Sequence, residues 1–363
     1  MSLCDINGNT IPTGGSISSS DIKTALIGAV ADGTVNLGST IGATLSYTSP
    51  STSWETNAET AYQALLTAYK KVPNSAIPFF ITTDQHGRGV EPNRWLNNQD
   101  KDGMNMLNIN LGDTVTDVFN LTELNNVLAR SKQIKNYVSV VGNHECKYGS
   151  EIMSNYDLCR TFVSTNLVKH MNPSPSNSYA IIDDLHNVKY IVLEEYVMNA
   201  DGKGFERGLT AETTEWLIHE LSEDDGYDIV LLKHWFLTLP NGGLYVDRNG
   251  TQDTASASGY LGELTTLFIN RKNKTAGTYI DIDGVSHSYD FTNCKTDLLC
   301  ALHGHEHLET YGYADKLLCY CADWLGSEYN CTFGLIDRES NKLRVWVFDK
   351  TSVLEEFSMD LNI

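Results

Sequence analysis

Residues 77–86, which read Ile-Pro-Phe-Phe-Ile-Thr-Thr-Asp-Gln-His, pass from a hydrophobic run into a carboxylate and an imidazole within one short stretch. A short apolar run bounded by polar residues is typical of a buried strand. The same change occurs twice more along the chain, where Met106–Leu111 precedes Asp113 and where Tyr137–Val141 precedes Asn143. These three runs therefore predict strands that each end in side chains able to bind a ligand.

The spacing of these polar residues indicates how the strands are connected. Asp113 follows Asp84 by 29 residues, and Asn143 follows Asp113 by 30 residues. A strand, a crossover helix and a parallel strand together take about 30 residues. The carboxyl ends of parallel strands lie at one edge of a sheet, where the binding sites of α/β proteins form. Two later runs also end in polar residues and are expected at the same edge: Ile229–Leu232 before Lys233-His234, and Asp297–Leu302 before His303-Gly-His-Glu-His307.

Helical segments alternate with these strands. Apolar residues recur at helical spacing over 57–71 and over 121–134, and Thr210 is a suitable N-cap for a third helix. This alternation favours an α/β protein. A further helix is expected over Tyr260–Asn270, followed by a hairpin over 279–289. A further strand is expected over Val188–Leu193, and an antiparallel hairpin is expected from the strands Thr332–Ile336 and Leu343–Phe348.

The composition excludes several classes of protein. Of the 363 residues, 26 are basic and 46 are acidic, so the formal net charge is -20. A protein that coats duplex DNA needs a basic face, and none is evident. An acidic surface repels polyanions, so a phosphate-bearing substrate needs a local positive site such as bound metal. No run of 18 apolar residues occurs, which predicts that no helix spans a membrane. Eight scattered cysteines favour reduced thiols and a cytoplasmic location.

The first 56 residues differ from the rest of the chain. Lys23 is their only basic residue, and Ser, Thr and Gly dominate them. This composition fits an extended arm or a small β-rich appendage, and it equally fits a flexible leader. We therefore expect an N-terminal arm over 1–56 and one α/β domain over 57–363. Residues 241–294 are expected to form an insertion that either overhangs the crevice or decorates the surface.

Eight polar residues from the five strand ends are expected to meet in one crevice: Asp84, His86, Asp113, Asn143, His144, His234, His305 and His307. This set offers oxygen and imidazole donors and no thiolate, which suits Mn, Fe or Zn rather than a structural zinc site built on cysteine. So many ligands exceed what one tetrahedral ion needs, whereas two ions that share a carboxylate use them economically. Asp113 is the expected bridge, because it is central in the series and follows a glycine that frees the backbone.

Five blocks, taken in order, carry a family resemblance. They are Asp84-x-His86, Gly112-Asp113-x-x-x-Asp117, Gly142-Asn-His-Glu145, the single His234 after an apolar strand, and Gly304-His-x-His307. Together they span 84–307, and in this order they resemble the calcineurin-like metallophosphoesterases. The resemblance implies a four-layer α/β/β/α sandwich with mixed sheets, to which the Ser/Thr/Gly-rich arm is added.

The resemblance also implies a role for each position. Two divalent or trivalent ions (Mn, Fe or Zn) would bind, one to Asp84, His86, His307 and the bridging Asp113, the other to Asp113, Asn143, His234 and His305. A hydroxide held between the ions would attack phosphorus in line with the leaving oxygen. His144 would donate a proton or a hydrogen bond to that oxygen, and Asp117 would orient His144.

The expected function is metal-dependent hydrolysis of a phosphate ester, with monoester, diester and nucleotide substrates left open. The expected partner is a small phosphate ester, without long nucleic acid or membrane. The alternative is a structural module of a phage particle or cell surface that docks or self-associates through residues 1–56, which would place the chain outside the cytoplasm.

Two further features near the blocks have alternative interpretations. Arg88 and Arg94 follow the first block, and each is expected to form either a phosphate contact or a surface salt bridge. Trp235 and Phe236 directly follow His234, where the resembled family often has small residues or proline. Access to the second metal ion is therefore expected to differ from that in the family.

Overall fold

The computed structural model describes residues 52–88, 92, 95–96, 104–116, 120–148, 151–152, 167–173, 176–198, 205–240, 243–253, 262–326 and 328–362. The chain divides into two units, Met1–Thr48 and Ser49–Ile363, and all the described residues lie in the second unit. Nearly all of the expected arm over 1–56 therefore lies outside the described residues.

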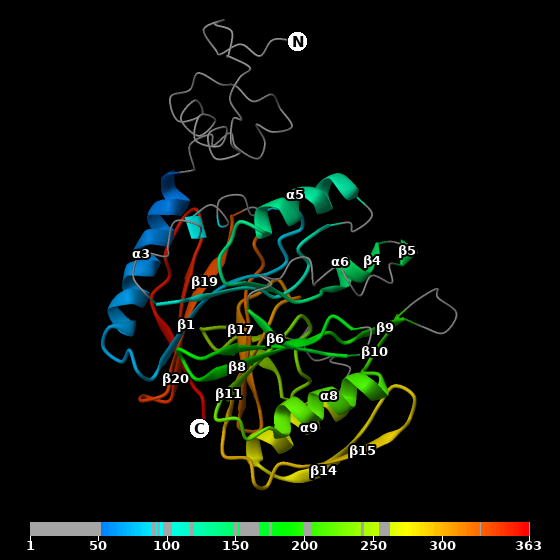
Figure 1. The fold of residues 1–363 in the computed structure, drawn as a ribbon. Helices are drawn as coiled ribbons and strands as arrows, with labels where there is room; N and C mark the ends of the chain where they lie inside the picture. The colour runs from blue at the N-terminus through cyan, green and yellow to red at the C-terminus, as the bar shows by residue number, and fades with distance from the viewer. Residues whose placement is uncertain are drawn as a thin grey trace, which may run out of the picture. The chain divides into compact units, whose positions relative to one another are not determined.

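The first large sheet contains six strands in the order β21-β20-β19-β1-β2-β3 (Figure 1). Three neighbouring strands run parallel: β1 (Ala76–Thr82), β2 (Leu107–Asn110) and β3 (Tyr137–Ser139). Antiparallel pairs add β19 (Cys331–Asp337), β20 (Lys342–Phe348) and β21 (Phe357–Asp360). The predicted parallel arrangement of the first three strands and the predicted C-terminal hairpin are both confirmed.

The second large sheet contains nine strands in the order β13-β12-β17-β18-β16-β11-β8-β7-β6. Its parallel centre consists of β8 (Val188–Leu193), β11 (Asp228–Lys233), β16 (Leu298–His303) and β18 (Leu317–Cys321). The antiparallel strands on either side are β6 (Val168–Met171), β7 (Tyr179–Asp183), β12 (Tyr245–Val246), β13 (Gln252–Asp253) and β17 (Thr310–Ala314). The sheet is thus mixed, as expected.

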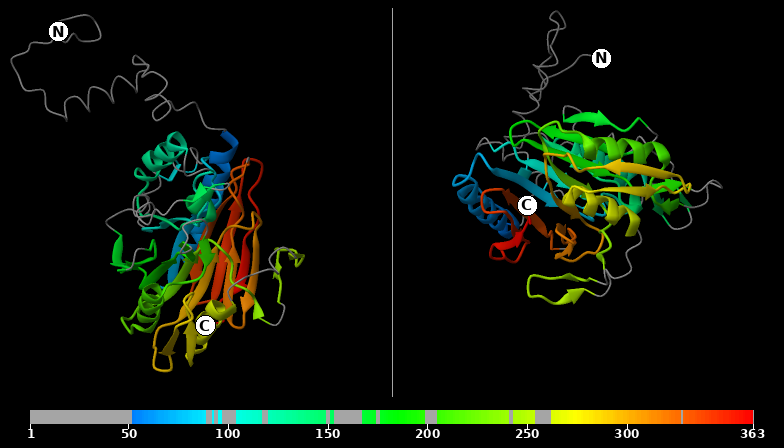
Figure 2. Two further views of the ribbon diagram at one scale, coloured as in Figure 1. Left: turned by 90° about the vertical axis from the view of Figure 1, so that its right-hand side faces the viewer. Right: turned by 90° about the horizontal axis from the view of Figure 1, so that it is seen from below.

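The two sheets pack face to face, and helices cover their outer faces (Figure 2). The alternation of side chains along β1 shows how the layers form. Phe79 and Ile81 enter the core between the sheets, whereas Phe80 enters the core beneath α3 (Thr52–Tyr69) and α5 (Leu121–Ser131). In β11, Val230 and Leu232 face the first sheet. The four-layer α/β/β/α sandwich is therefore confirmed.

The outer layer of the second sheet contains α8 (Ala211–Ser222) and α9 (Gly262–Asn273). Thr210 caps α8 as predicted, because its side chain accepts a hydrogen bond from Thr213 N. The predicted hairpin in the 241–294 segment forms as β14 (Ala276–Ile280) and β15 (Ser286–Asp290). Its Tyr279 and Tyr289 are buried in the same core as the two helices. This hairpin therefore belongs to the outer helical layer.

Short elements complete the described part of the chain. They are α6 (Asn143–Cys146), β4 (Lys147–Tyr148), β5 (Glu151–Ile152), β9 (Tyr196–Met198) and β10 (Phe205–Arg207). Among the described helices, none has both the length and the apolar character required to span a bilayer. The cysteines that the structure describes are all buried: Cys146, Cys294, Cys300, Cys319, Cys321 and Cys331.

Candidate metal centre

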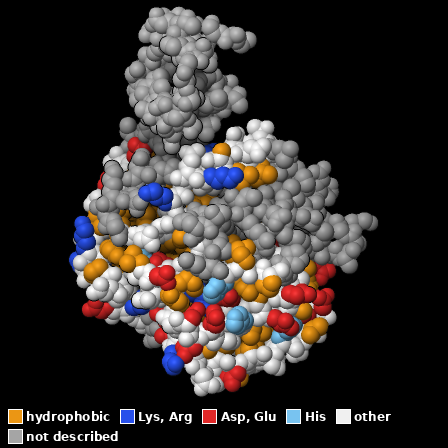
Figure 3. Space-filling view, viewed as in Figure 1, with side chains coloured by type: hydrophobic (Ala, Val, Ile, Leu, Met, Phe, Trp, Pro, Cys, Tyr) orange, Lys and Arg blue, Asp and Glu red, His pale blue; other side chains and the backbone are white. Residues whose placement is uncertain are grey.

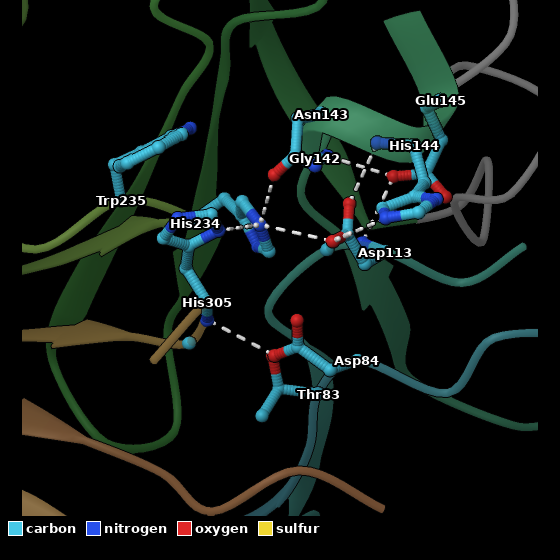
Figure 4. A network of polar contacts seen from close by, with 12 residues as sticks. Thr83, Asp84, Asp113, Gly142, Asn143, His144, Glu145, His234, Trp235 and His305 are labelled. Carbon is cyan, nitrogen blue, oxygen red and sulfur yellow. Dashed lines mark hydrogen bonds and ion pairs between the residues drawn. The ribbon is translucent and has the colours of Figure 1, made fainter. Parts of the chain in front are cut away.

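The candidate site lies where strands of both sheets end (Figure 4). Backbone hydrogen bonds join the turns that follow these strands. Asp84 N donates to Gly112 O over 2.9 Å, which joins the turns after β1 and β2. Gly304 N donates to His234 O over 3.0 Å, which joins the turns after β16 and β11. The packing of the two sheets therefore places the two sets of turns at one rim.

The first group of ligand atoms comes from Asp84, His86 and His307, and these atoms lie within 4.8 Å of one another. The carboxylate of Asp84 is fully buried, and polar contacts at both of its oxygen atoms fix its orientation. Its Oδ2 accepts hydrogen bonds from Thr83 Oγ1 over 2.7 Å and from His305 N over 3.0 Å. Its Oδ1 lies 3.1 Å from His307 Nε2. Three residues that the sequence placed on one metal ion are thus brought together.

The second group comes from Asp113, His234 and His305, which also offer ligand atoms within 4.8 Å of one another. Asn143 joins this group, because its Oδ1 lies 3.1 Å from His234 Nε2. A further cluster links Asp113 to His86 and His144. Asp113 therefore lies between the two expected sets of ligands, where the sequence placed the bridging carboxylate.

The donor atoms around His234 fit a cation. Its Nδ1 lies 2.7 Å from Leu111 O and must donate to that oxygen, so the Nε2 atom faces the site. Around Nε2 lie three atoms that carry lone pairs: Asn143 Oδ1 at 3.1 Å, His305 Nδ1 at 3.2 Å and Asp113 Oδ2 at 3.4 Å. A buried cluster of lone pairs needs a positive charge at its centre, which a metal ion or a proton supplies.

The pKa values of these groups follow from the same arrangement. Burial lowers the pKa of His234, but the charge of Asp113, the hydrogen bond with it and the charge of Asp84 together outweigh burial and raise that pKa to about 10. The pKa of His305 is lowered to about 3 by burial and by the neighbouring charge of His234. Burial opposes ionisation of Asp113, yet His234 holds the pKa of this carboxyl below its ordinary value. Asp113 is thus held in the ionised form that a metal-binding carboxylate needs, and a metal ion that bound here would replace the proton on His234 Nε2.

Five of the seven expected ligands adopt a left-handed backbone conformation. This conformation is uncommon for residues other than glycine and is concentrated at functional sites. The five φ angles are 50° for Asp84, 45° for His86, 51° for Asp113, 75° for His305 and 57° for His307. The rim therefore concentrates backbone strain at the residues that would hold the ions.

His144 lies beside the ligands with its side chain about one third exposed, at 32%. Its Nδ1 is 2.7 Å from Thr116 O and must donate to it, which leaves Nε2 directed into the site, 3.9 Å from Asp113 Oδ2. Its ring centroid is 4.6 Å from that of His86. The carbonyl of Thr116 thus orients His144, whereas Asp117, which was expected to do so, lies outside the described residues.

Sequence reasoning assigned no role to Glu145, although this residue ends the third block. Glu145 is buried and accepts hydrogen bonds from three backbone N–H groups: Gly142 at 2.7 Å, Asp113 at 2.9 Å and Val115 at 3.1 Å. Burial and the charge of Asp113 raise the pKa of Glu145 to about 7. Glu145 therefore joins the turn that carries Asp113 to the turn that carries Asn143.

Two tryptophans stack on the candidate ligands. Trp324 is stacked on His307, with ring centroids 4.6 Å apart and an angle of 3° between the planes. Trp235 lies 3.5 Å from His305 between ring centroids, and Arg207 covers it with Cζ 4.0 Å from the indole centroid. Trp235 thus packs on a candidate ligand of the second group. No pattern in the sequence predicted a role for Trp324 at the site.

A separate acidic cluster contains His170, Glu220 and Glu223, whose ligand atoms lie within 4.8 Å of one another. Figure 3 shows acidic side chains and histidines close together over α8. The buried Lys189 Nζ lies 3.4 Å from Glu220 Oε2 and 3.2 Å from Glu223 Oε2. An ammonium group already neutralises these carboxylates, so the cluster is an ion-pair network.

No protein-family model matches the chain, and no curated protein matches it. Solved structures do match. One is a candidate 5′-nucleotidase from Staphylococcus aureus, with 14% identity and a TM-score of 0.43 over 79% of this chain and 54% of that protein. Another is the phosphopantetheinyl hydrolase of Mycobacterium tuberculosis, with 11% identity and a TM-score of 0.37 over 69% of this chain and 91% of that protein. A third is the anchor in the inner membrane complex of Plasmodium, with 10% identity and a TM-score of 0.45 over 80% of this chain and 89% of that protein.

The four-layer arrangement that the structure shows is the one that the resemblance to calcineurin-like metallophosphoesterases implies. This chain spans about half of the length of the Staphylococcus aureus protein. At these identities and TM-scores the matched structures assign no activity to this chain.

Proposed function

We propose that this chain hydrolyses phosphate esters with the help of two metal ions. The observation that carries the proposal is the meeting of two groups of ligand atoms at the buried Asp113, on the rim where both sheets end. One ion would be held by Asp84, His86, His307 and Asp113, and the other by Asp113, Asn143, His234 and His305. When bound, such ions supply neutralisation of the phosphoryl charge and a water of lowered pKa.

The protein's own residues would fix this arrangement and handle the proton. Glu145 holds the backbone of Asp113 and Gly142, which limits how far the shared carboxylate can shift. His144 would donate a proton to the leaving oxygen from Nε2. Because its Nδ1 already donates to Thr116 O, His144 has a proton to give only when both ring nitrogens are protonated.

The test combines metal analysis with a panel of phosphate esters. We expect the purified chain to bind Mn, Fe or Zn and to hydrolyse at least one ester in the panel. Asp113→Asn should lower metal content and reduce kcat by several orders of magnitude, because it disturbs both groups of ligands. Asp315→Asn is the matched control: Asp315 also has a left-handed backbone, with φ 55°, but lies in the β17–β18 turn. Full activity in Asp113→Asn would refute the proposal.

The proposed partner is a small phosphate ester, which fits a chain whose net charge of -20 disfavours long nucleic acid. We propose no membrane partner and a cytoplasmic location. The alternative, a structural module docked through residues 1–56, stays a prediction because nearly all of that segment lies outside the described residues. Deletion of residues 1–51, which leaves α3 and the buried Trp54 in place, tests it, since catalysis should survive while any self-association is lost.

A further inference from the structure

Arg88 lies two residues after His86 and is exposed to solvent. Gly87 between them has a φ of 74°, a conformation that lets the chain turn sharply after the candidate ligand. The guanidinium Cζ of Arg88 lies 5.7 Å from the ring centroid of Trp324, and the same ring is stacked on His307. Arg88 is therefore held beside the first group of ligands by an aromatic side chain that itself contacts that group.

Arg88 differs from the other arginines that the structure describes, because its guanidinium makes no hydrogen bond or ion pair with any described residue. Each of the other six has a polar partner: Arg130 with Gly87 O, Arg207 with Glu195, Arg248 with Glu309, Arg271 with Leu221 O, Arg338 with Asp228 and Arg344 with Glu356. The sequence left open whether Arg88 forms a surface salt bridge or contacts a phosphate. The described residues supply no salt bridge, which favours the phosphate contact.

The position of Arg88 indicates which phosphate it contacts. The phosphoryl group that is transferred would lie against the ions, so its charge is already neutralised. His144, the proposed proton donor to the leaving oxygen, packs against His86 with ring centroids 4.6 Å apart. Arg88 instead lies over Trp324, which stacks on His307, so its guanidinium is beside the ligands and a further phosphate of the substrate, rather than the transferred one, is the group left for it to bind. A guanidinium there suits a second phosphate, which it binds through two parallel hydrogen bonds.

We propose that Arg88 binds a second phosphate on the leaving group, so that the preferred substrates are compounds with a P–O–P bond, such as nucleoside diphosphates or inorganic pyrophosphate. The inference rests on the proposed function. The reaction is a hydrolysis: the oxygen of water bonds to the terminal phosphorus, and the bridging P–O bond breaks with its electron pair on the phosphate that Arg88 holds. One proton of the water is released, and the leaving oxygen is protonated from His144 or from solvent.

The experiment compares two substrates across three forms of the full chain loaded with metal. The substrates are a nucleoside diphosphate and p-nitrophenyl phosphate, whose leaving group carries no phosphate. The forms are the wild type, Arg88→Gln and Arg344→Gln. The last variant is the matched control, because Arg344 also lies over a tryptophan ring, with Cζ 5.4 Å from the Trp346 centroid, but it belongs to β20. Far-UV circular dichroism and metal content confirm that each form is folded and loaded.

We expect Arg88→Gln to lower the ratio of kcat/KM for the diphosphate to kcat/KM for the aryl phosphate by about 10- to 100-fold, mainly through KM. Arg344→Gln should leave that ratio unchanged. An Arg88→Gln enzyme with an unchanged ratio would overturn the inference, and so would a wild type that cleaves only the aryl phosphate; both results leave the proposed function intact. A metal-loaded wild type that cleaves other phosphate esters but neither of these two would also overturn the inference, whereas one that cleaves no ester of the wider panel would overturn the proposed function itself.

Discussion

Glu195 is shared by two cations in a buried ion network behind the candidate metal centre, and replacing it with glutamine tests how that network stabilises the fold. Its carboxylate pairs with Lys233 Nζ and lies 3.6 Å from Arg207 Nη2. The side chains of Lys233 and Glu195 are almost completely buried, and that of Arg207 is 13% exposed. Arg207 in turn covers Trp235, which packs on His305. The network therefore connects the core to one candidate ligand.

The magnitude follows from the distances and the burial. Two unit charges 3.6 Å apart attract each other by about 5 kcal/mol at an effective dielectric constant of about 20. In Glu195→Gln, both cations would lose the carboxylate that pairs with them, and the loss of one partner of a buried pair costs about 3–5 kcal/mol. We therefore expect the free energy of unfolding to fall by about 3–5 kcal/mol. Because Arg207 loses its pairing with Glu195, Trp235 should also support His305 less well.

Urea denaturation followed by circular dichroism measures the free energy of unfolding, and a metal titration measures the effect on the site. The control is Asp360→Asn, which breaks the ion pair between Lys342 Nζ and Asp360 Oδ1, 2.6 Å apart, whose side chains are 38% and 61% exposed. An exposed pair contributes less than about 1 kcal/mol. If Glu195→Gln lowers the free energy of unfolding by no more than Asp360→Asn does, the buried network contributes no more to stability than an exposed ion pair.

Three further outcomes are expected. His144→Ala should retain its metal and lose about 100- to 10,000-fold in kcat with poor leaving groups but less with good ones, and equal losses for all leaving groups would reject proton donation. Gly142→Ala should weaken metal affinity by about 10- to 100-fold in a titration, because the added methyl group would overlap Asp113 Oδ1. An unchanged affinity would show that the backbone of this turn can shift to make room for the methyl group. Burial opposes ionisation of Asp281, but hydrogen bonds from His287 and from the backbone of Val285 and Asp283 together lower its pKa, so its ionised form stabilises the fold above pH 3.8 and loses this effect as the pH falls through the lower folded value. Asp281→Asn should therefore reduce the free energy of unfolding at about pH 7 and progressively less as the pH falls below 3.8, and a loss of equal size throughout would contradict this assignment.

Periodicity and spacing predicted the strands that carry the site. The interval of about 30 residues between Asp84, Asp113 and Asn143 predicted three parallel strands with a common edge, and β1, β2 and β3 are parallel. This inference works because a crossover connection has a narrow range of lengths, so residues at equal intervals fall at equivalent ends of neighbouring strands. The same local patterns do not say which sheet a strand joins. Only the packing of Phe79, Ile81, Val230 and Leu232 in one core shows that two sheets share the site.

The residues that support the site could not be assigned from the sequence. Glu145 is visible in its block, but its partners are backbone N–H groups, and one of them belongs to Asp113 in another turn. Any residue type offers such a donor, so the sequence carries no sign of the pairing. Trp324 lies beyond β18, and its stacking on His307 depends on the parallel pairing of β18 with β16. Both contacts join residues that are far apart in the sequence, whereas sequence patterns predict local structure and the intervals between strands.

The left-handed conformations at the rim indicate that the protein itself fixes the geometry of the ligands. Each such conformation costs about 1–3 kcal/mol and persists only where the surrounding structure determines it. Here that structure is visible in backbone hydrogen bonds: Asp84 N donates to Gly112 O, and His86 N donates to Asp113 O, over 2.9 and 3.0 Å. These backbone hydrogen bonds help to hold the strained turns in place. A cation that bound to side chains fixed in this way would cost the chain little conformational entropy.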